Sequence, residues 1–224
     1  VFDLPGITQM NAATGALRHG VLYDLLDREQ SVTDIRSASV DRLASKFGSD
    51  RVQSQRVSKV ARQFFLMLSS QHQQADQERF LRKLQWAAQL HEIGSQISHS
   101  DYHKHGAYIL GNADAPGFAQ PELQRLSLLV LGHRGKLRKL DADFEDQPFM
   151  EQLMCLRIAV ILCHARRDPD LEGLEIKAGH AGIQEFVLRF RKDWAKSYPQ
   201  SVHLLREEVV AWQKTPWSLN LWAY

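Results

Sequence analysis

Histidines and an acidic residue gather in one short part of the chain, and residues of these types can bind metal ions. His91 and Glu92 are adjacent near the end of a predicted helix. Further histidines follow soon after them: His99, His103 and His105. A neighbouring imidazole and carboxylate can together hold one divalent metal ion, although the zinc-protease motif His-Glu-x-x-His is excluded by Ser95. Histidines also cap helices and form buried hydrogen bonds, so these residues alone leave both interpretations open.

A second candidate site is a run of cationic residues. The segment from Gln124 to Leu140 contains no Asp or Glu. Its basic side chains are Arg125, Arg134, Lys136, Arg138 and Lys139, and His133 adds a titratable group. Arg and Lys match phosphate oxygens in charge and geometry, whereas the ordinary alternative is a solvated helix end and loop. Because the net charge is only +2, any affinity for polyanions must come from such a local patch.

Length and composition indicate an ordinary globular protein. With 224 residues the chain is long enough for one large domain or two small ones. No apolar run approaches the roughly 18 residues that a membrane span needs. The sequence begins with Val and has no signal-peptide pattern, so we expect an excised part of a cytoplasmic protein. Cys155 and Cys163 lie about 12 Å apart along one predicted helix, which is too far for a disulfide, so both should be free thiols.

Apolar residues recur with helical spacing through most of the chain. The helices that we expect cover approximately residues 15–26, 34–47, 50–68, 77–93, 101–110, 121–132 and 148–165. Gly48 suits a helix end, and Asp50 suits the N-cap of the next helix. No strand-like alternation occurs before residue 170, so residues 1–168 are predicted to form an all-helical domain.

The pattern changes after Asp168. Apolar and polar residues alternate over 174–178 and 186–190, with glycines between these runs, which is typical of a hairpin. A helix beginning at Pro199 and a final strand to Tyr224 should follow. The predicted class is therefore mainly α, with a small α+β subdomain of ββαβ order at 169–224. The tryptophans of this subdomain are expected in its core: Trp194, Trp212, Trp217 and Trp222.

Four segments together resemble one known family: Gly15–Leu26, Trp86–Gly94, His99–Leu110 and His133–Lys136. They look like the C-terminal half of the bacterial exopolyphosphatase and guanosine pentaphosphate phosphohydrolase (Ppx/GppA) family. That resemblance implies an HD-like helical domain followed by a small α+β domain, in a cytoplasmic hydrolase of phosphoanhydride bonds. It also implies that two N-terminal actin-like domains, absent here, bind Mg²⁺ or Mn²⁺ and perform the hydrolysis. We therefore expect no catalytic residue and no cofactor in this chain.

The resemblance also assigns positions that correspond to an HD metal site. Active HD phosphohydrolases use an early histidine, an adjacent His-Asp pair and a late aspartate. Arg56, His91, Glu92 and Val160 stand at these positions here. A cation in place of one ligand and a hydrocarbon in place of another would prevent divalent metal binding. We expect a degenerate site without metal, in which Arg56 pairs with Glu92.

Three further residues resemble family positions beside the same cleft: His103, Lys104 and His105. We expect them to bind polyphosphate together with the cationic run, and His103, His105 and His133 to add positive charge below neutral pH. The expected partners are inorganic polyphosphate or guanosine pentaphosphate (pppGpp), the N-terminal catalytic domains of the same chain, and a second copy in a homodimer. The chain would then be the substrate-binding and regulatory part of the enzyme. The alternatives are a docking or dimerisation module without substrate contact and an independent HD phosphohydrolase.

Overall fold

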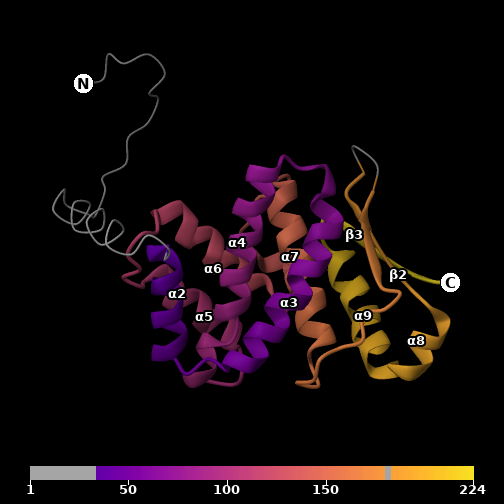
Figure 1. Cartoon of the computed structure of the whole chain (residues 1–224), viewed down its shortest axis with the longest axis horizontal. Coiled ribbons are helices and arrows are strands. Elements are labelled where there is room, and N and C mark those ends of the chain that lie inside the picture. Colours follow the sequence, from indigo (N-terminus) through magenta and orange to yellow (C-terminus); the bar gives the residue numbers. More distant parts are fainter. Residues whose placement is uncertain (1–33, 180–182) are drawn as a thin grey trace, which may run out of the picture.

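Helices dominate the computed structural model, which describes residues 34–179 and 183–224 (Figure 1). The helical part comprises α2 (Ile35–Lys46), α3 (Arg51–Leu68), α4 (Gln74–Leu90), α5 (Tyr102–Gly111), α6 (Gln120–Gly132) and α7 (Gln147–Leu162). The prediction of a mainly α chain is confirmed, and the helix predicted at 15–26 lies outside the described residues. Among the described helices, none has the length and apolar character required to cross a membrane.

Aspartate side chains begin several helices, as the sequence predicted for Asp50. The carboxylate of Asp34 accepts a hydrogen bond from the backbone N–H of Arg36 at the start of α2. Asp50 accepts two such bonds at the start of α3, and Asp146 accepts one at the start of α7. Each bond satisfies an amide that has no partner within its helix. The predicted end of α4 at residue 93 is wrong, because the helix stops at Leu90.

A short 3-10 helix at Ile93–Gln96 follows α4 and passes very close to α5. A Cβ atom on Gly94 would lie 2.0 Å from the carbonyl oxygen of Tyr102 and 2.4 Å from the backbone nitrogen of Gly106. Both neighbours are backbone atoms, which cannot rotate out of the way. Glycine is therefore required at position 94 by this close contact of two backbone segments.

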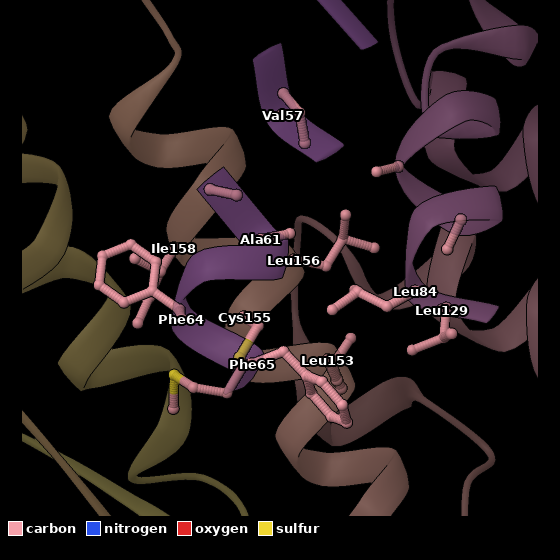
Figure 2. Packing of buried hydrophobic residues seen from close by; sticks show 14 of the residues in the cluster. Val57, Ala61, Phe64, Phe65, Leu84, Leu129, Leu153, Cys155, Leu156 and Ile158 are labelled. Atoms are coloured by element: carbon pink, nitrogen blue, oxygen red, sulfur yellow. The ribbon is translucent and has the colours of Figure 1, made fainter. Parts of the chain in front are cut away.

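The core is centred on α7, which is buried on nearly all sides. Figure 2 shows side chains of α3 meeting those of α7, with Leu84 from α4 and Leu129 from α6 beside them. Phe64 and Phe65 of α3 are fully buried in this cluster. Both cysteines are buried free thiols, in agreement with the sequence-based prediction. A helix surrounded in this way holds its few polar side chains in fixed positions.

The C-terminal part is a three-stranded sheet with two helices. Strands β1 (Glu175–Ala178) and β2 (Glu185–Phe190) pair antiparallel, and β3 (Ser218–Ala223) pairs parallel with β2. The parallel pairing needs a crossover, which α8 (Lys192–Ser197) and α9 (Pro199–Trp212) supply. The predicted ββαβ order is therefore wrong by one helix: the order is ββααβ. The predicted core position of Trp222 is also wrong, since its exposed fraction is 62%, whereas the other three tryptophans are buried.

The two predicted subdomains share one hydrophobic cluster. It includes residues of α3 and α7 together with Ile176 of β1, Phe186 of β2 and Trp212 of α9. Helix α3 contacts β1, and α7 contacts α9 (Figure 1). The boundary near residue 168 stays a prediction. Because the packing is continuous across this position, side chains of α9 contact α7 of the helical part.

Candidate functional site

Two histidines of the candidate site occupy equivalent places at the ends of two helices. His91 follows α4 and His133 follows α6 as the C-cap residue. Their Nδ1 atoms lie 2.7 Å from the carbonyl oxygen of Ala88 and 2.6 Å from that of Val130, respectively. A carbonyl only accepts, so each Nδ1 carries the hydrogen and each neutral ring has an acceptor at Nε2. Such rings close helix ends and offer no positive charge to an anion.

The two rings also pack against each other inside the protein. Their centroids are 5.3 Å apart at nearly right angles, and the ring of His103 lies 6.3 Å from that of His133. The hydroxyl of Tyr102 lies 3.4 Å from Nε2 of His133. The Nδ1 atom of His103 is buried and has no hydrogen-bond partner among the described residues. Three histidine rings, those of His91, His103 and His133, thus lie close together, whereas His99 is exposed.

Burial works against a positive charge on these histidines. It lowers the pKa of His91, and it lowers the pKa of His133 well below the ordinary value for imidazole. Burial and the neighbouring Arg134 guanidinium lower the pKa of His103. The hypothesis that His103 and His133 become cations just below neutral pH is therefore opposed by the structure. His105, on α5, is only partly buried.

The predicted cationic run begins in α6, and its second part, residues 133–140, follows that helix and is called the basic loop. Three of its side chains are buried, namely His133, Leu137 and Leu140. The side chains between them are exposed: Arg134, Lys136, Arg138 and Lys139. Gly135 has a φ of +79°, and a Cβ there would lie 3.1 Å from Nε2 of His103. Buried anchors and a close glycine therefore hold the backbone while the cations face solvent.

The exposed cations of the basic loop have no acidic partner among the ion pairs of residues 34–179 and 183–224. The guanidinium of Arg134 lies over the ring of Tyr102, 4.8 Å from its centroid. Lys104 differs from them, because its ammonium group pairs with Asp101 at 2.9 Å. Among the cations predicted to bind phosphate, those without an acidic partner in the described part of the chain are therefore the exposed ones of the basic loop.

Arg125 was predicted to bind substrate, but its guanidinium is already occupied. It forms an ion pair with Asp146 and donates to the side-chain oxygen of Gln152 at 2.8 and 3.1 Å. The rings of Phe80 and Phe149 lie 5.5 and 5.2 Å from it. With both polar partners and ring contacts in place, Arg125 joins α6 to the start of α7. We leave it out of the candidate surface.

The positions that the family resemblance assigns to an HD metal site belong to separate networks. Arg56 pairs with Asp168 at 2.9 Å, and Glu92 pairs with Arg166 at 2.8 Å. The predicted pair of Arg56 with Glu92 is therefore wrong. The physical reason is that the segment after α7 brings Asp168 to Arg56 and Arg166 to Glu92, and Arg166 also contacts Asp50 at 2.7 Å. Nothing in the sequence pattern distinguished these charges from other surface charges.

The donor set at this place does not fit a divalent metal. Within residues 34–179 and 183–224 no three His, Cys, Asp or Glu side chains come together in a way that could hold one. Val160 is a hydrocarbon packed against the core, and the carboxylate of Glu92 already has a guanidinium partner. The ring of His91 packs against the ring of His133 and takes no part in the ion pair between Glu92 and Arg166. In the described part of the chain these residues form core packing, ion pairs and ring contacts.

Two buried charged residues beside the basic loop were missed at the level of sequence. Arg157 lies on α7 and Glu208 on α9, with exposed fractions of 3% and 5%. They form an ion pair across the predicted domain boundary. A charged residue inside the apolar α7 sequence was a usable signal, because charges are rarely buried without a partner. The partner could not be identified before the packing of α9 was known.

Comparison with known proteins shows which family this chain is similar to. Residues 35–209 match the family described as "Ppx/GppA phosphatase, domain III". A protein of Pseudoalteromonas translucida (strain TAC 125), named guanosine-5'-triphosphate,3'-diphosphate pyrophosphatase, is 35% identical over 225 residues. The similarity covers 98% of this chain and 44% of the relative. The chain thus spans less than half of the length of that protein.

Proposed function

This chain belongs to the Ppx/GppA phosphatase family, and we propose that it holds the phosphate groups of the substrate for a hydrolase of phosphoanhydride bonds. The substrate class is a chain of linked phosphates, either inorganic polyphosphate or the phosphates of pppGpp. The relative's name refers to guanosine-5'-triphosphate,3'-diphosphate, which belongs to this class. Hydrolysis itself, with Mg²⁺ or Mn²⁺, is proposed to take place on other domains of the parent enzyme.

The observation that carries the proposal is the basic loop. Arg134, Lys136, Arg138 and Lys139 are exposed, and none of them has an acidic partner among the described ion pairs. Other cations of the chain, such as Arg36 and Arg166, are paired with carboxylates. Cations that repel one another and lack counter-charges favour the binding of an anion.

The way in which the loop is built also suits a polyanion. Buried His133, Leu137 and Leu140 fix the backbone, so little conformational freedom of the main chain is lost when a ligand binds. Arg side chains donate in a planar fork, and Lys side chains supply compact charges, so both types match repeated phosphate oxygens. Contacts of this kind away from the reacting end would let an enzyme trim a long polyphosphate without releasing it.

The first prediction concerns polyphosphate binding by the chain and its dependence on salt. We expect affinity to fall steeply as salt rises, because each neutralised phosphate releases condensed counterions. Replacement of all four cations by Ala should weaken binding to long chains more than to short ones. It should also lower the slope of log affinity against log salt by about 3, taking the value for single-stranded nucleic acid. The measurement is a titration with long and short polyphosphate at two salt concentrations.

A matched control removes two arginines and two lysines elsewhere. Lys59, Arg62, Arg206 and Lys214 are exposed, and their replacement by Ala changes the net charge equally. This variant should keep the wild-type salt slope. If the basic-loop variant binds long polyphosphate as tightly as wild type, the loop is only a solvated surface. A docking or dimerisation module without substrate contact then becomes the better hypothesis.

A further inference from the structure

One buried guanidinium connects the C-terminal helix α9 with the basic loop. Arg157 of α7 forms an ion pair with Glu208 of α9, in which Nη2 donates to Oε2 at 2.7 Å and Nε donates to Oε1. Its other hydrogen bonds go to backbone carbonyls at the end of α6 and in the basic loop. Nη1 donates to the carbonyl oxygen of Gly132 at 2.5 Å, and Nη2 also lies 3.3 Å from that of Gly135. All of these contacts come from one rigid, planar group.

The two carbonyls that Arg157 binds flank the first residues of the basic loop. Gly132 is the last residue of α6, and Gly135 has the positive φ that turns the chain. Between them lie His133, whose Nδ1 is bound to Val130, and the exposed Arg134. Fixing both carbonyls fixes the peptide planes that direct Arg134 and Lys136 into solvent.

Glu208 is itself held from the sheet side. Its Oε1 accepts a hydrogen bond of 2.5 Å from the indole nitrogen of Trp212, which is fully buried. The ring of Trp212 packs edge-on against Phe186 of β2 at 5.8 Å. A continuous series of contacts therefore runs from the sheet through α9 and α7 to the basic loop.

Stability alone does not account for this ion pair. Two charges buried together lose hydration that their attraction barely repays, and apolar residues of the same size often serve stability equally well. An apolar pair could not bind the carbonyls of Gly132 and Gly135. What the ion pair provides beyond stability is therefore a fixed position for these two carbonyls.

We infer that Arg157 and Glu208 are positioning residues, which set the conformation of residues 133–136 and thereby the affinity of the basic loop for linked phosphates. The affinity part rests on the proposed function, whereas the conformational part does not. Neither side chain touches the ligand, because both are buried beneath the loop. The C-terminal subdomain would thus control a binding surface that lies on the helical part.

The test combines a conformational and a binding readout on three variants. Arg157→Met with Glu208→Leu removes both charges and leaves no buried charge unpaired. Arg157→Lys keeps the ion pair but lacks the planar fork that reaches two carbonyls, so it serves if the double variant fails to fold. Glu207→Gln is the matched control, because Glu207 is the exposed neighbour of Glu208 on α9. The readouts are NMR order parameters of residues 134–136, polyphosphate affinity, and thermal unfolding.

In folded double-variant or Arg157→Lys protein we expect the order parameters to fall from about 0.85 to below about 0.6. Polyphosphate should bind about tenfold more weakly, as expected when one charge-assisted hydrogen bond no longer orders the site. Glu207→Gln should match wild type in both. Unchanged order parameters in a folded variant would overturn the inference, and so would a mobile loop with unchanged affinity. If wild-type protein does not bind polyphosphate, the proposed function fails, and the order parameters still decide whether the pair positions the loop.

Discussion

His91 and His133 illustrate how residues with catalytic potential can serve a structure. Each ring closes the end of a helix through Nδ1, and each is almost completely buried. Burial favours the neutral form of both, so the folded protein binds protons to them less readily than the unfolded chain does. These histidines therefore link stability to pH.

The direction in which stability changes with pH leads to a prediction. An unfolded histidine binds its proton near pH 6.5, whereas folded His133 binds it only at lower pH, so the unfolded state takes up more protons in between. Stability should be full above about pH 6.5 and should fall as pH decreases toward the folded pKa. His133→Asn, whose amide can donate to Val130, should flatten this dependence. Chemical denaturation at several pH values is the measurement.

His203 provides the control for that experiment, since its side chain is 72% exposed. His203→Asn should leave the pH dependence of stability as it is in wild type. A wild-type protein whose unfolding free energy does not change between about pH 7.5 and pH 5.5 would contradict the prediction.

The site could be predicted from the sequence only where residues stand close together in it. The exposed cations of the basic loop follow from local spacing and from the absence of acids. The packing of His133 against His91 and His103 did not follow, because it joins helix ends that are distant in sequence. The partners of Arg125, Arg56 and Glu92 did not follow, because each is contributed by a segment distant in sequence. Long-range ion pairs depend on packing, and no local pattern encodes them.

At the level of elements, most helices could be located in the sequence from their capping residues and from the helical spacing of apolar residues. Asp34 and Asp50 begin α2 and α3 as predicted, because a side-chain cap is a local interaction. The short α8 was missed because its six residues are fewer than two turns and give no helical periodicity. Alternation also revealed that β3 is a strand without revealing that it pairs parallel to β2, since strand direction depends on the crossover.

Two tryptophans near β3 allow a matched test of how this element is held. Trp217 is 5% exposed, stacks on Phe186 at 4.7 Å, and donates to the carbonyl oxygen of Phe144 at 2.7 Å. Trp217→Ala should lower the free energy of unfolding by about 3–5 kcal/mol, because it leaves a large cavity. The measurement is denaturant unfolding of the purified chain.

Trp222→Ala is the corresponding control, because Trp222 lies on β3 and Trp217 directly precedes it. Its side chain is 62% exposed, so the change in stability should stay within about 0.5 kcal/mol. Equal losses for both variants would show that the stacking of Trp217 does not anchor β3 to the rest of the molecule.

At the scale of the whole molecule, the described residues expose the unpaired cations of the basic loop, and no three of their His, Cys, Asp or Glu side chains come together to hold a metal ion. We predict that this chain alone does not hydrolyse polyphosphate or pppGpp with Mg²⁺ or Mn²⁺. Arg56 and Val160, at the positions that the resemblance assigns to metal ligands, cannot bind a cation, and Glu92 is paired with Arg166. Phosphate release and metal content of the purified chain are the measurements. Stoichiometric metal together with turnover that His91→Ala abolishes would instead support an independent HD phosphohydrolase. The homodimer that the family resemblance implies also stays a prediction.

The contact at Gly94 changes what the Leu-His-Glu-Ile-Gly motif can tell about descent. Gly94 is needed because two backbone segments touch there, and His91 is needed to close a helix inside the core. Selection for folding alone would preserve both residues, whether or not a metal ion binds nearby. A homologue that retains this motif has thus retained the way α4 meets α5, and its chemistry must be judged from other positions.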